Sequence, residues 1–532
     1  MKTWSTPTKL LAVCLLASGF STFMFEPILG GMMGMVLGGS IEHMGATFML
    51  MVIGMGVATL VQMLMNEEHL IEKFIIIESA LSILGAFAPI LMYLAFAHFT
   101  YHSVLFFYVI AFAIGFLMGF EIPLAMRINN NYTPDLKVNL VQTYMVDLFG
   151  GGLALVVWKL VVGVIPFTLL SFYVAAMNLI IALATYAYFI GQSMVKRVWL
   201  PRLSMAIALV GLATGYIMTP KWEIHAQQQF YDDPIVYHTQ TSYQTITLTK
   251  WVGPTGEDFR LYLNTHLQMS SQDEAIYHEE LVHPAMHLAA QPDRVLILGG
   301  GDGGTLREVL KHDVQSVTLV ELDPAMIEFA RTHPAMRRIN NNSFAGAHID
   351  TITSHTPIAV SDRSVQVYIQ DADLFLTHTQ GEYDVIICDF PDPRTPELAK
   401  LYSKEFYLKA RSALAADGVI VVQSTSAQHC PKPFWSIHYT LESAGFNVVP
   451  MHVYVPSFRD WGFNLGMDHL TPEQILVRLE AIQEWKVSTT EVTPAVAKAS
   501  LAFIKSMKDD SVPVNTMTFP VLVRLYRDSW VL

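Results

Sequence analysis

The chain has 532 residues, of which 52% are hydrophobic and only 15% charged, and its formal net charge is −13. This length accommodates two or three domains. So apolar a composition means that the whole chain cannot be an ordinary soluble enzyme. The negative charge argues against nucleic acid as a partner, because the phosphates would be repelled.

The apolar residues are concentrated before residue 220. The first apolar stretch continues through Gly30 and Gly31 without a small-residue cleavage pattern, so it is predicted to be a retained span rather than a signal peptide. Residues 1–220 are therefore predicted to be an all-α transmembrane bundle in a lipid bilayer. Seven stretches are each about long enough to cross ~30 Å of hydrocarbon as a helix: residues 8–36, 43–64, 71–98, 104–126, 139–163, 165–190 and 202–219.

Four acidic residues lie inside these stretches: Glu26, Glu78, Glu121 and Asp147. A charge there is costly and usually faces a bundle interior or a cavity. Two interpretations stay open, a path or sensor for a cationic ligand, or polar groups that pack helices or lie near the interface. Lys159 is a candidate ion-pair partner, and residues 150–152, all glycine, predict close helix packing.

After residue 222 the sequence reads as a soluble enzyme. Polar and apolar residues alternate over 243–249 and again over 259–264, as in half-buried strands. Residues 222–290 are therefore predicted to be a small antiparallel β unit followed by a helix. The three cysteines, at positions 14, 388 and 430, form no pair or Cys/His cluster that would indicate a disulfide framework or a zinc site.

Residues 291–468 are predicted to form a Rossmann-like, methyltransferase-type α/β domain. Strands that alternate with helices indicate a parallel, doubly wound sheet. The remaining residues, 469–532, are polar and helix-prone and form a C-terminal extension. Five buried strands are predicted, at 295–298, 317–320, 365–369, 385–388 and 419–422.

The strongest chemical signal is the glycine-rich segment 299–304, which directly follows a predicted strand and opens a helix. Glycines there let the backbone turn sharply and approach a ligand closely. Asp302 sharpens the prediction, because a carboxylate in this loop would repel a pyrophosphate and attract a cationic amine or sulfonium. The ligand is therefore predicted to be nucleotide-like and positively charged.

Further acids are predicted at the carboxyl ends of the following strands, where doubly wound sheets bind ligands. Glu321, about 20 residues after the glycines, is placed to bind ribose hydroxyls. Asp371 is placed to meet an adenine amino group, whereas Asp373 is interpreted as a helix cap or a solvated acid. Asp389 and Asp392 can hold an amine, and a carboxylate can take the proton that an amine loses when it attacks carbon.

Three groups of residues together resemble the spermidine synthase family, in the family's order and spacing. The resemblance covers residues 235–465, and the apolar first half resembles a bacterial subfamily with an N-terminal multi-helix membrane region. The groups are Gln268…Asp273-Glu274…Tyr277-His278-Glu279…Leu281…His283-Pro284, then Gly299-Gly-Gly-Asp-Gly-Gly-Thr-Leu-Arg-Glu, then Asp389…Asp392-Pro393…Leu401-Tyr402…Phe406-Tyr407…Gln423.

The resemblance implies transfer of an aminopropyl group from decarboxylated S-adenosylmethionine to a polyamine such as putrescine, giving spermidine and methylthioadenosine. It implies no prosthetic group and no metal. In the donor site, Asp302 would bind the aminopropyl amine, Glu321 the ribose and Asp371 the adenine. The other residues of the donor site would be Gln244, Gly299, Gly301, Gly303 and Ala372.

On the acceptor side the resemblance implies that Asp389 is the catalytic acid, which takes the proton from the attacking amine. The residues implied around the acceptor are Gln268, Tyr277, His278, Asp392 and Gln423.

The chain departs from the family mostly on the acceptor side, which leaves the identity of the acceptor open. Asn264-Thr265 stands where an aspartate-glycine turn is common, and Phe390-Pro391 stands where small polar residues separate the paired acids. Ser424-Thr425-Ser426 lacks a common acid, and Pro456-Ser457-Phe458 replaces a proline-threonine-tyrosine segment.

Two other functions stay open at this point. An S-adenosylmethionine-dependent methyltransferase would share the sheet and the ribose acid, although Asp302 would repel the carboxylate of its donor. A non-catalytic membrane sensor or transporter of polyamines would use the acids of the apolar half.

The predicted location is the inner cell membrane, with several spans. Lys and Arg fall in alternate loops and place the N-terminus in the cytoplasm, and seven crossings would then put the enzyme domain outside. The implied donor is a cytoplasmic metabolite, so either one of these two inferences fails or one segment, the glycine-rich first or the short seventh, does not cross. We expect a cytoplasmic enzyme domain. The resemblance also implies a homodimer as one form of assembly.

Overall fold

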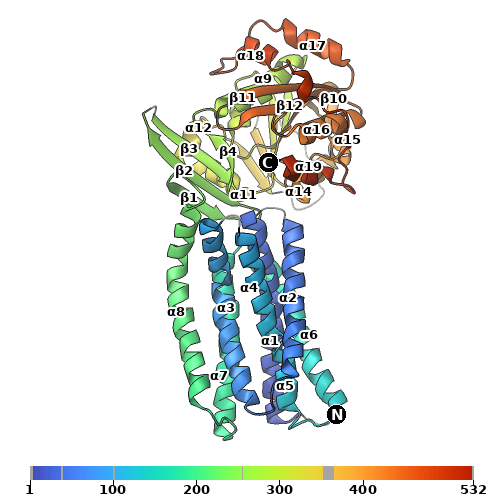
Figure 1. Ribbon diagram of the computed structural model, residues 1–532. Helices are drawn as coiled ribbons and strands as arrows, with labels where there is room; N and C mark the ends of the chain where they lie inside the picture. The colour runs from blue at the N-terminus through green and yellow to red at the C-terminus, as the bar shows by residue number, and fades with distance from the viewer. Residues whose placement is uncertain (1–3, 38–39, 100–101, 255, 352–364, 530–532) are drawn as a thin grey trace. The chain divides into compact units, whose positions relative to one another are not determined.

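The computed structural model describes residues 4–37, 40–99, 102–254, 256–351 and 365–529. The chain divides into two compact units, one that ends at Ile235 and one that begins at Val236 (Figure 1). Each unit is considered by itself.

The first unit is a bundle of helices. Seven helical segments among the described residues are long and apolar enough to cross a membrane, as predicted, with α4 and α5 counting together as one. The last, α8, is longer than expected and runs to Gln228. The helices are α1 (Thr6–Leu37), α2 (Ser40–Gln62), α3 (Leu70–His98), α4 (Ser103–Met118), α5 (Glu121–Asn129), α6 (Leu136–Val161), α7 (Phe167–Gly191) and α8 (Trp199–Gln228).

Glycines let α1 and α6 pack closely. A Cβ atom at Gly150 would lie 2.1 Å from the carbonyl oxygen of Leu16, and one at Gly151 would lie 2.5 Å from the Phe23 ring. Gly152 meets open space, so only two of the three glycines serve this contact. Lys159 is exposed and forms no ion pair with a described acid, which leaves the buried acids of the bundle without that partner.

The second unit begins with a four-stranded sheet in the order β1-β2-β3-β4. Its strands are β1 (Ile235–Gln240), β2 (Thr245–Gly253), β3 (Gly256–Leu263) and β4 (His266–Ser270). Strands β2, β3 and β4 pair antiparallel, as the alternating pattern predicted. Asn264 and Thr265 form the turn between β3 and β4 and have φ of 48° and 68°, the left-handed backbone that two-residue hairpins of type I′ require.

We expect Thr265→Gly to raise the free energy of unfolding of this unit by roughly 0.5–1 kcal/mol. A β-branched residue is strained at positive φ, whereas glycine is not, and the larger entropy of glycine in the unfolded chain offsets part of the gain. Thermal unfolding of the two proteins measures the change. The same substitution at Thr249, which lies inside β2, should destabilise the unit instead.

The larger sheet has eight strands in the order β11-β12-β10-β9-β5-β6-β8-β7. The strands from β10 to β7 pair parallel, whereas β12 and β11 add an antiparallel edge. The five predicted strands are β5, β6, β8, β9 and β10. The bounds are β5 (Arg294–Gly299), β6 (Ser316–Glu321), β7 (His348–Thr351), β8 (Val365–Ile369), β9 (Tyr383–Asp389), β10 (Leu414–Gln423), β11 (Asn447–Val455) and β12 (Arg459–Met467).

Helices cover both faces of this sheet (Figure 1). Alternate residues of each strand enter opposite cores: Val295 packs with Leu281 of α9 on one face, and Leu296 with Phe406 of α15 on the other. The helices are α9 (Glu274–Leu288), α10 (Gly304–Val309), α11 (Pro324–Thr332), α12 (Pro334–Ile339), α13 (Ala372–Leu376), α14 (Pro396–Lys400), α15 (Lys404–Ala413), α16 (Pro431–Ser443), α17 (Pro472–Ala481), α18 (Pro494–Ala499) and α19 (Val521–Ser529).

The order of the strands determines where a ligand can bind. From β5 the chain moves to β6 on one side, and β9 later lies on the other side of β5. This reversal is a topological switch point, where doubly wound sheets bind ligands beyond the carboxyl ends of the strands. Gly299, the last residue of β5, stands directly opposite Asp389, the last residue of β9.

Candidate active site

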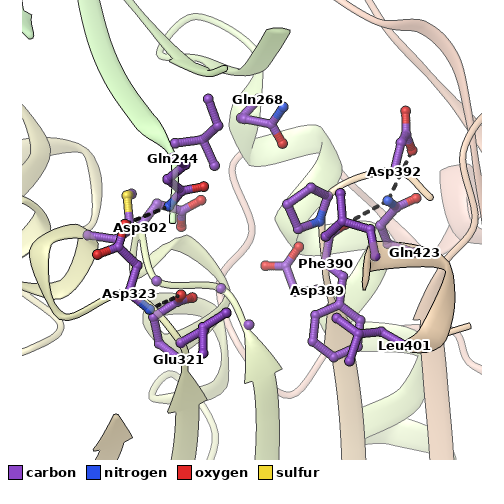
Figure 2. Close-up of a pocket in the computed structure, with 18 of the residues that line it drawn as sticks. Gln244, Gln268, Asp302, Glu321, Asp323, Asp389, Phe390, Asp392, Leu401 and Gln423 are labelled. Atoms are coloured by element: carbon purple, nitrogen blue, oxygen red, sulfur yellow. Dashed lines mark hydrogen bonds between the residues drawn. The ribbon is translucent and has the colours of Figure 1, made fainter. Parts of the chain in front are cut away.

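A cavity of about 480 Å³ opens at this switch point. All the predicted site residues line it except Gly303. Gly303 instead precedes α10 with φ of 86°, and a Cβ atom there would lie 2.6 Å from the Phe344 ring, so its role is to let the chain turn. Figure 2 shows Gln244, Asp302 and Glu321 on one side of the cavity and Asp389, Asp392 and Gln423 on the other.

The glycine-rich loop packs against the acids on both sides of the cavity. The amide of Gly300 donates to the carbonyl oxygen of Asp389 at 3.0 Å. A Cβ atom at Gly299 would lie 2.2 Å from that same oxygen, and one at Gly301 would lie 2.8 Å from a carboxylate oxygen of Glu321. Only glycine fits this close approach of backbone to both acids.

Asp302 is held within a chain of charged side chains. Its Oδ1 accepts a hydrogen bond from the Gly304 amide at 2.7 Å and faces Nε2 of His278 at 3.7 Å. His278 in turn contacts Glu274 at 2.6 Å through Nδ1, and Arg307 donates two hydrogen bonds to the same glutamate, at 2.7 and 2.9 Å. The sequence prediction included Asp302 and His278 but missed Glu274 and Arg307 as the groups that orient them.

This chain of charges shifts the pKa values of its members. Burial acts to lower the pKa of His278, but the hydrogen bond to Glu274 and the charge of Asp302 together raise it to about 9. Burial acts to raise the pKa of Glu274, but His278 and Arg307 lower it to about 2. Burial raises the pKa of Asp302, and the charge of His278 opposes that shift. His278 and Glu274 are therefore a charged pair at neutral pH.

Glu321 lies at the carboxyl end of β6, as predicted. Its Oε1 accepts the amide of Asp323 at 2.9 Å, and burial raises its pKa to about 7. Asp323 accepts hydrogen bonds from the Gln244 amide at 3.1 Å and from the Thr241 hydroxyl at 2.8 Å. Gln244 is thus fixed beside Glu321 by Asp323, a residue that the sequence analysis did not single out.

Asp371, not Asp373, caps helix α13. Oδ1 of Asp371 accepts the amides of Asp373 and Leu374, and its Oδ2 accepts a hydrogen bond from Lys400 at 2.7 Å. Burial acts to raise the pKa of Asp371, but Lys400 and the two amides lower it. Asp373 instead pairs with Lys409 at 2.6 Å. A cap must precede the first helical residue, and the helix begins at Ala372, two residues earlier than a cap at Asp373 would require.

Both carboxylate oxygens of Asp389 accept hydrogen bonds. The Tyr277 hydroxyl donates to Oδ1 and the Thr305 hydroxyl donates to Oδ2, each at 2.6 Å. Burial and the charge of Asp389 raise the pKa of Tyr277, so its hydroxyl stays protonated and acts as a donor. Thr305 lies inside the glycine-rich motif, but nothing in the sequence alone indicated that it would contact Asp389.

Asp392 is buried, and the C-terminal helix helps to hold it. Its Oδ1 accepts from the Gln423 amide at 3.2 Å, and its Oδ2 accepts from the Tyr526 hydroxyl at 2.8 Å. Arg394 lies 3.5 Å from Oδ2 and donates to the Tyr526 hydroxyl at 3.2 Å. Tyr526 lies in the extension for which the sequence indicated no chemistry, because a lone tyrosine in a short amphipathic helix carries no recognisable motif.

The other predicted acceptor residue, Gln268, projects from β4 at the rim of the cavity. Its amide nitrogen donates to the carbonyl oxygens of His266 and Leu267 at 3.2 and 3.1 Å. Phe458 and Trp461 also line the cavity, and the Trp461 indole N–H has no hydrogen-bond partner among the described residues. Ser457, next to Phe458, binds Asp273 through its amide and its hydroxyl, at 2.6 and 2.8 Å.

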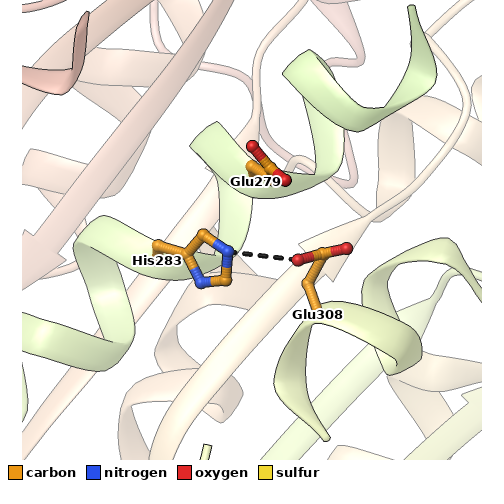
Figure 3. Close-up of side chains that lie close together, drawn as sticks. All are labelled: Glu279, His283 and Glu308. Atoms are coloured by element: carbon orange, nitrogen blue, oxygen red, sulfur yellow. Dashed lines mark ion pairs between the residues drawn. The ribbon is translucent and has the colours of Figure 1, made fainter. Parts of the chain in front are cut away.

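A second cluster, outside the cavity, has the residue types of a metal site. The possible ligand atoms of Glu279, His283 and Glu308 lie within 4.8 Å of one another, all buried (Figure 3). However, Glu308 already contacts the Lys311 ammonium at 2.6 Å and Arg307 at 2.7 Å. Glu279 accepts three backbone amides of residues 490–492. Cations of the chain itself balance these acids, and the contacts tie α9 to α10 and to the segment before α18.

Comparison with known proteins adds to this geometry. Residues 274–476 match the family model of the spermine/spermidine synthase domain. The chain is 34% identical to polyamine aminopropyltransferase 1 of Streptomyces coelicolor, covering 98% of this chain and 94% of that protein. It is also 34% identical to the polyamine aminopropyltransferase of Oceanobacillus iheyensis, covering 95% and 94%. Polyamine aminopropyltransferase 2 of Aquifex aeolicus is 32% identical, covering 97% and 98%.

Proposed function

Because the chain belongs to the polyamine aminopropyltransferase family, we propose that the cavity at the ends of β5, β6 and β9 is where it transfers the aminopropyl group. Aminopropyl transfer follows from the family, whereas the residue roles and the acceptor are proposals. One observation carries them: acids on two sides of a single cavity face each other, with Asp302 and Glu321 opposite Asp389 (Figure 2).

The donor, decarboxylated S-adenosylmethionine, is proposed to lie along the glycine-rich loop. Asp302 would accept hydrogen bonds from its primary ammonium group, and Glu321 would accept hydrogen bonds from the ribose hydroxyls. Asp371, whose oxygens already accept the cap amides and Lys400, would offer a remaining lone pair to the adenine amino group. The acids also compensate the positive sulfonium, so the site favours this cation over a neutral nucleoside.

In the reaction, the nitrogen of the acceptor amine forms a bond to the carbon next to sulfur. The carbon–sulfur bond breaks, its electron pair stays on sulfur, and methylthioadenosine leaves as a neutral thioether. The attacking nitrogen must lose a proton, and Asp389 is proposed to take it. Tyr277 and Thr305 fix the carboxylate between them, so that a lone pair is directed at the acceptor.

The acceptor is proposed to be putrescine or a related diamine, with its reacting nitrogen at Asp389 and its distal ammonium toward Asp392. Gln423, Tyr526 and Arg394 orient Asp392. Gln268, at the rim on β4, and His278 are proposed to complete the acceptor pocket. The positive charge of Arg394 beside Asp392 would restrict how closely a second ammonium can approach.

Product analysis tests the proposed acceptor. Full-length protein is incubated with decarboxylated S-adenosylmethionine and a panel of di- and triamines, and the products are identified by mass spectrometry. We expect spermidine from putrescine, with one methylthioadenosine released for each spermidine. Methylated amines formed from S-adenosylmethionine would instead identify a methyltransferase and contradict the proposal.

We expect Tyr526→Phe to raise the KM for the acceptor amine while the KM for the donor is unchanged. Loss of one hydrogen bond to a charged group costs about 1.5 kcal/mol, which corresponds to roughly a tenfold change. Steady-state kinetics with each substrate varied separates the two KM values. Tyr439→Phe is the matched control, because Tyr439 donates to the exposed Asp510 outside the cavity, and neither KM should change.

The seven apolar helices support membrane residence, with several spans in the inner cell membrane and a cytoplasmic enzyme unit. The protein is expected to stay in the membrane fraction after alkaline carbonate washing. In inverted vesicles, protease should cleave the enzyme unit from outside; cleavage only after the vesicles are opened would contradict the cytoplasmic location. The homodimer stays a prediction, which molecular mass in detergent can test.

A further inference from the structure

Two acids lie fully buried in the helical bundle and have no cationic partner within the described part of the chain. Glu78 on α3 is 0% exposed, and Glu121 at the start of α5 is 2% exposed. Their carboxyl groups are close enough to act electrostatically on each other. The ion pairs of the bundle residues that the structure describes are His69–Glu72 and Arg127–Glu67, and neither involves these two acids.

Several polar atoms at this level of the bundle have no partner among the described residues. They include both carboxylate oxygens of Glu78, Oε1 of Glu121, both amide atoms of Asn178 and the hydroxyl of Ser82. Oε2 of Glu121 accepts a hydrogen bond from the Ser18 hydroxyl at 2.5 Å, and the Thr22 side chain also hydrogen-bonds to this glutamate. Because buried polar groups in proteins are nearly always hydrogen-bonded, so many unpartnered atoms in one region indicate a ligand.

Contacts between α3 and α7 place Asn178 at the same level as Glu78 and Ser82. The Ser171 hydroxyl donates to the carbonyl oxygen of Ala86, and the Lys196 amide donates to Glu72. These contacts make the two helices antiparallel. Asn178, two turns or roughly 10 Å beyond Ser171, therefore lies beside the turn of α3 that carries both residues, and it is fully buried.

The number of unpartnered hydrogen-bond acceptors in this cluster distinguishes a bound proton from a bound ammonium group. Buried carboxylates require a proton or a bound cation, since an uncompensated charge in apolar surroundings is very costly. One proton would satisfy a single oxygen and leave the other acceptors unpartnered. A primary ammonium group carries one positive charge and three N–H donors, which suits two carboxyl groups that keep one proton between them, a side-chain amide and a hydroxyl.

We propose that the bundle contains a second amine site, in which Glu78, Glu121 and Asn178 bind a primary ammonium group of a polyamine. The family to which the chain belongs acts on molecules that end in such groups. The site is separate from the catalytic cavity, all of whose lining residues belong to the other unit. It does not depend on the residue roles proposed for catalysis.

Equilibrium dialysis of full-length protein in lipid nanodiscs with radiolabelled putrescine or spermidine tests the proposal. Wild-type protein is expected to bind about one amine per chain more than Glu78→Gln, with Asn178→Leu showing the same loss without a change of charge. Release of methylthioadenosine by both variants should stay within about twofold of wild type, because the two sites share no residue, and this shows that the enzyme unit is folded.

Glu26→Gln is the matched control, because Glu26 is a half-buried acid of the same bundle outside this cluster. It should bind as much amine as the wild type. Equal binding by wild type and Glu78→Gln overturns the proposal. If Glu78→Gln binds less radioactive sodium than wild type while the two bind the same amount of amine, the proposal is overturned as well and the site is an alkali-metal site.

Discussion

Asp389→Asn is expected to lower kcat for aminopropyl transfer by about 10²- to 10⁴-fold, the contribution typical of a positioned general base. An asparagine amide keeps the size of the side chain but cannot take the proton from the attacking amine. Single-turnover release of methylthioadenosine measures the chemical step directly. Binding of methylthioadenosine, measured by calorimetry, should stay within about threefold, because remote contacts with the nucleoside are independent of the base.

The hydroxyl of Thr305 offers a matched comparison at the same carboxylate. Thr305→Val removes one of the two hydrogen bonds to Asp389 and keeps the shape of the side chain. It should reduce kcat by roughly 10-fold, less than loss of the base, because a positioned carboxylate remains. If Asp389→Asn keeps more activity than Thr305→Val, the proton is taken by another group and the proposed role of Asp389 is wrong.

The main elements of the fold could be predicted because each has a local signal. Long apolar stretches identified the helices of the first unit, and buried runs such as 295–298 identified the central strands. The antiparallel strands β11 and β12 were not predicted. They form a hairpin with each other, and β12 also pairs with β10, from which α16 and β11 separate it in the chain. Whether a run of residues forms a strand depends on such pairing more than on local propensity.

The site was predictable where residues follow strands and less so where contacts cross the fold. Glu321 and Asp389 could be placed because the carboxyl ends of parallel strands share one edge of the sheet. Tyr526 reaches Asp392 from a helix 134 residues further along the chain, and no spacing rule covers such a distance. The capping role of Asp371 was missed because helix ends are uncertain by one or two residues.

Asp302→Asn is expected to raise the KM for the donor by about 10- to 150-fold, because hydrogen bonds to charged groups contribute roughly 1.5–3 kcal/mol. The substitution removes the charge proposed to hold the donor's ammonium group. The asparagine oxygen can still accept the hydrogen bond from the Gly304 amide. Steady-state kinetics with the donor varied measures the change, and the KM for the acceptor should move much less.

The same variant tests why the site prefers a decarboxylated donor. S-adenosylmethionine carries a carboxylate near the position proposed for the ammonium group, so Asp302 should repel it, and asparagine should not. We therefore expect the inhibition constant of S-adenosylmethionine to fall while the KM for the true donor rises. Asp468→Asn, which removes an acid paired with Arg411 outside the cavity, is the control and should leave both unchanged. If both ligands weaken equally in Asp302→Asn, the residue supports the loop and does not select the donor by charge.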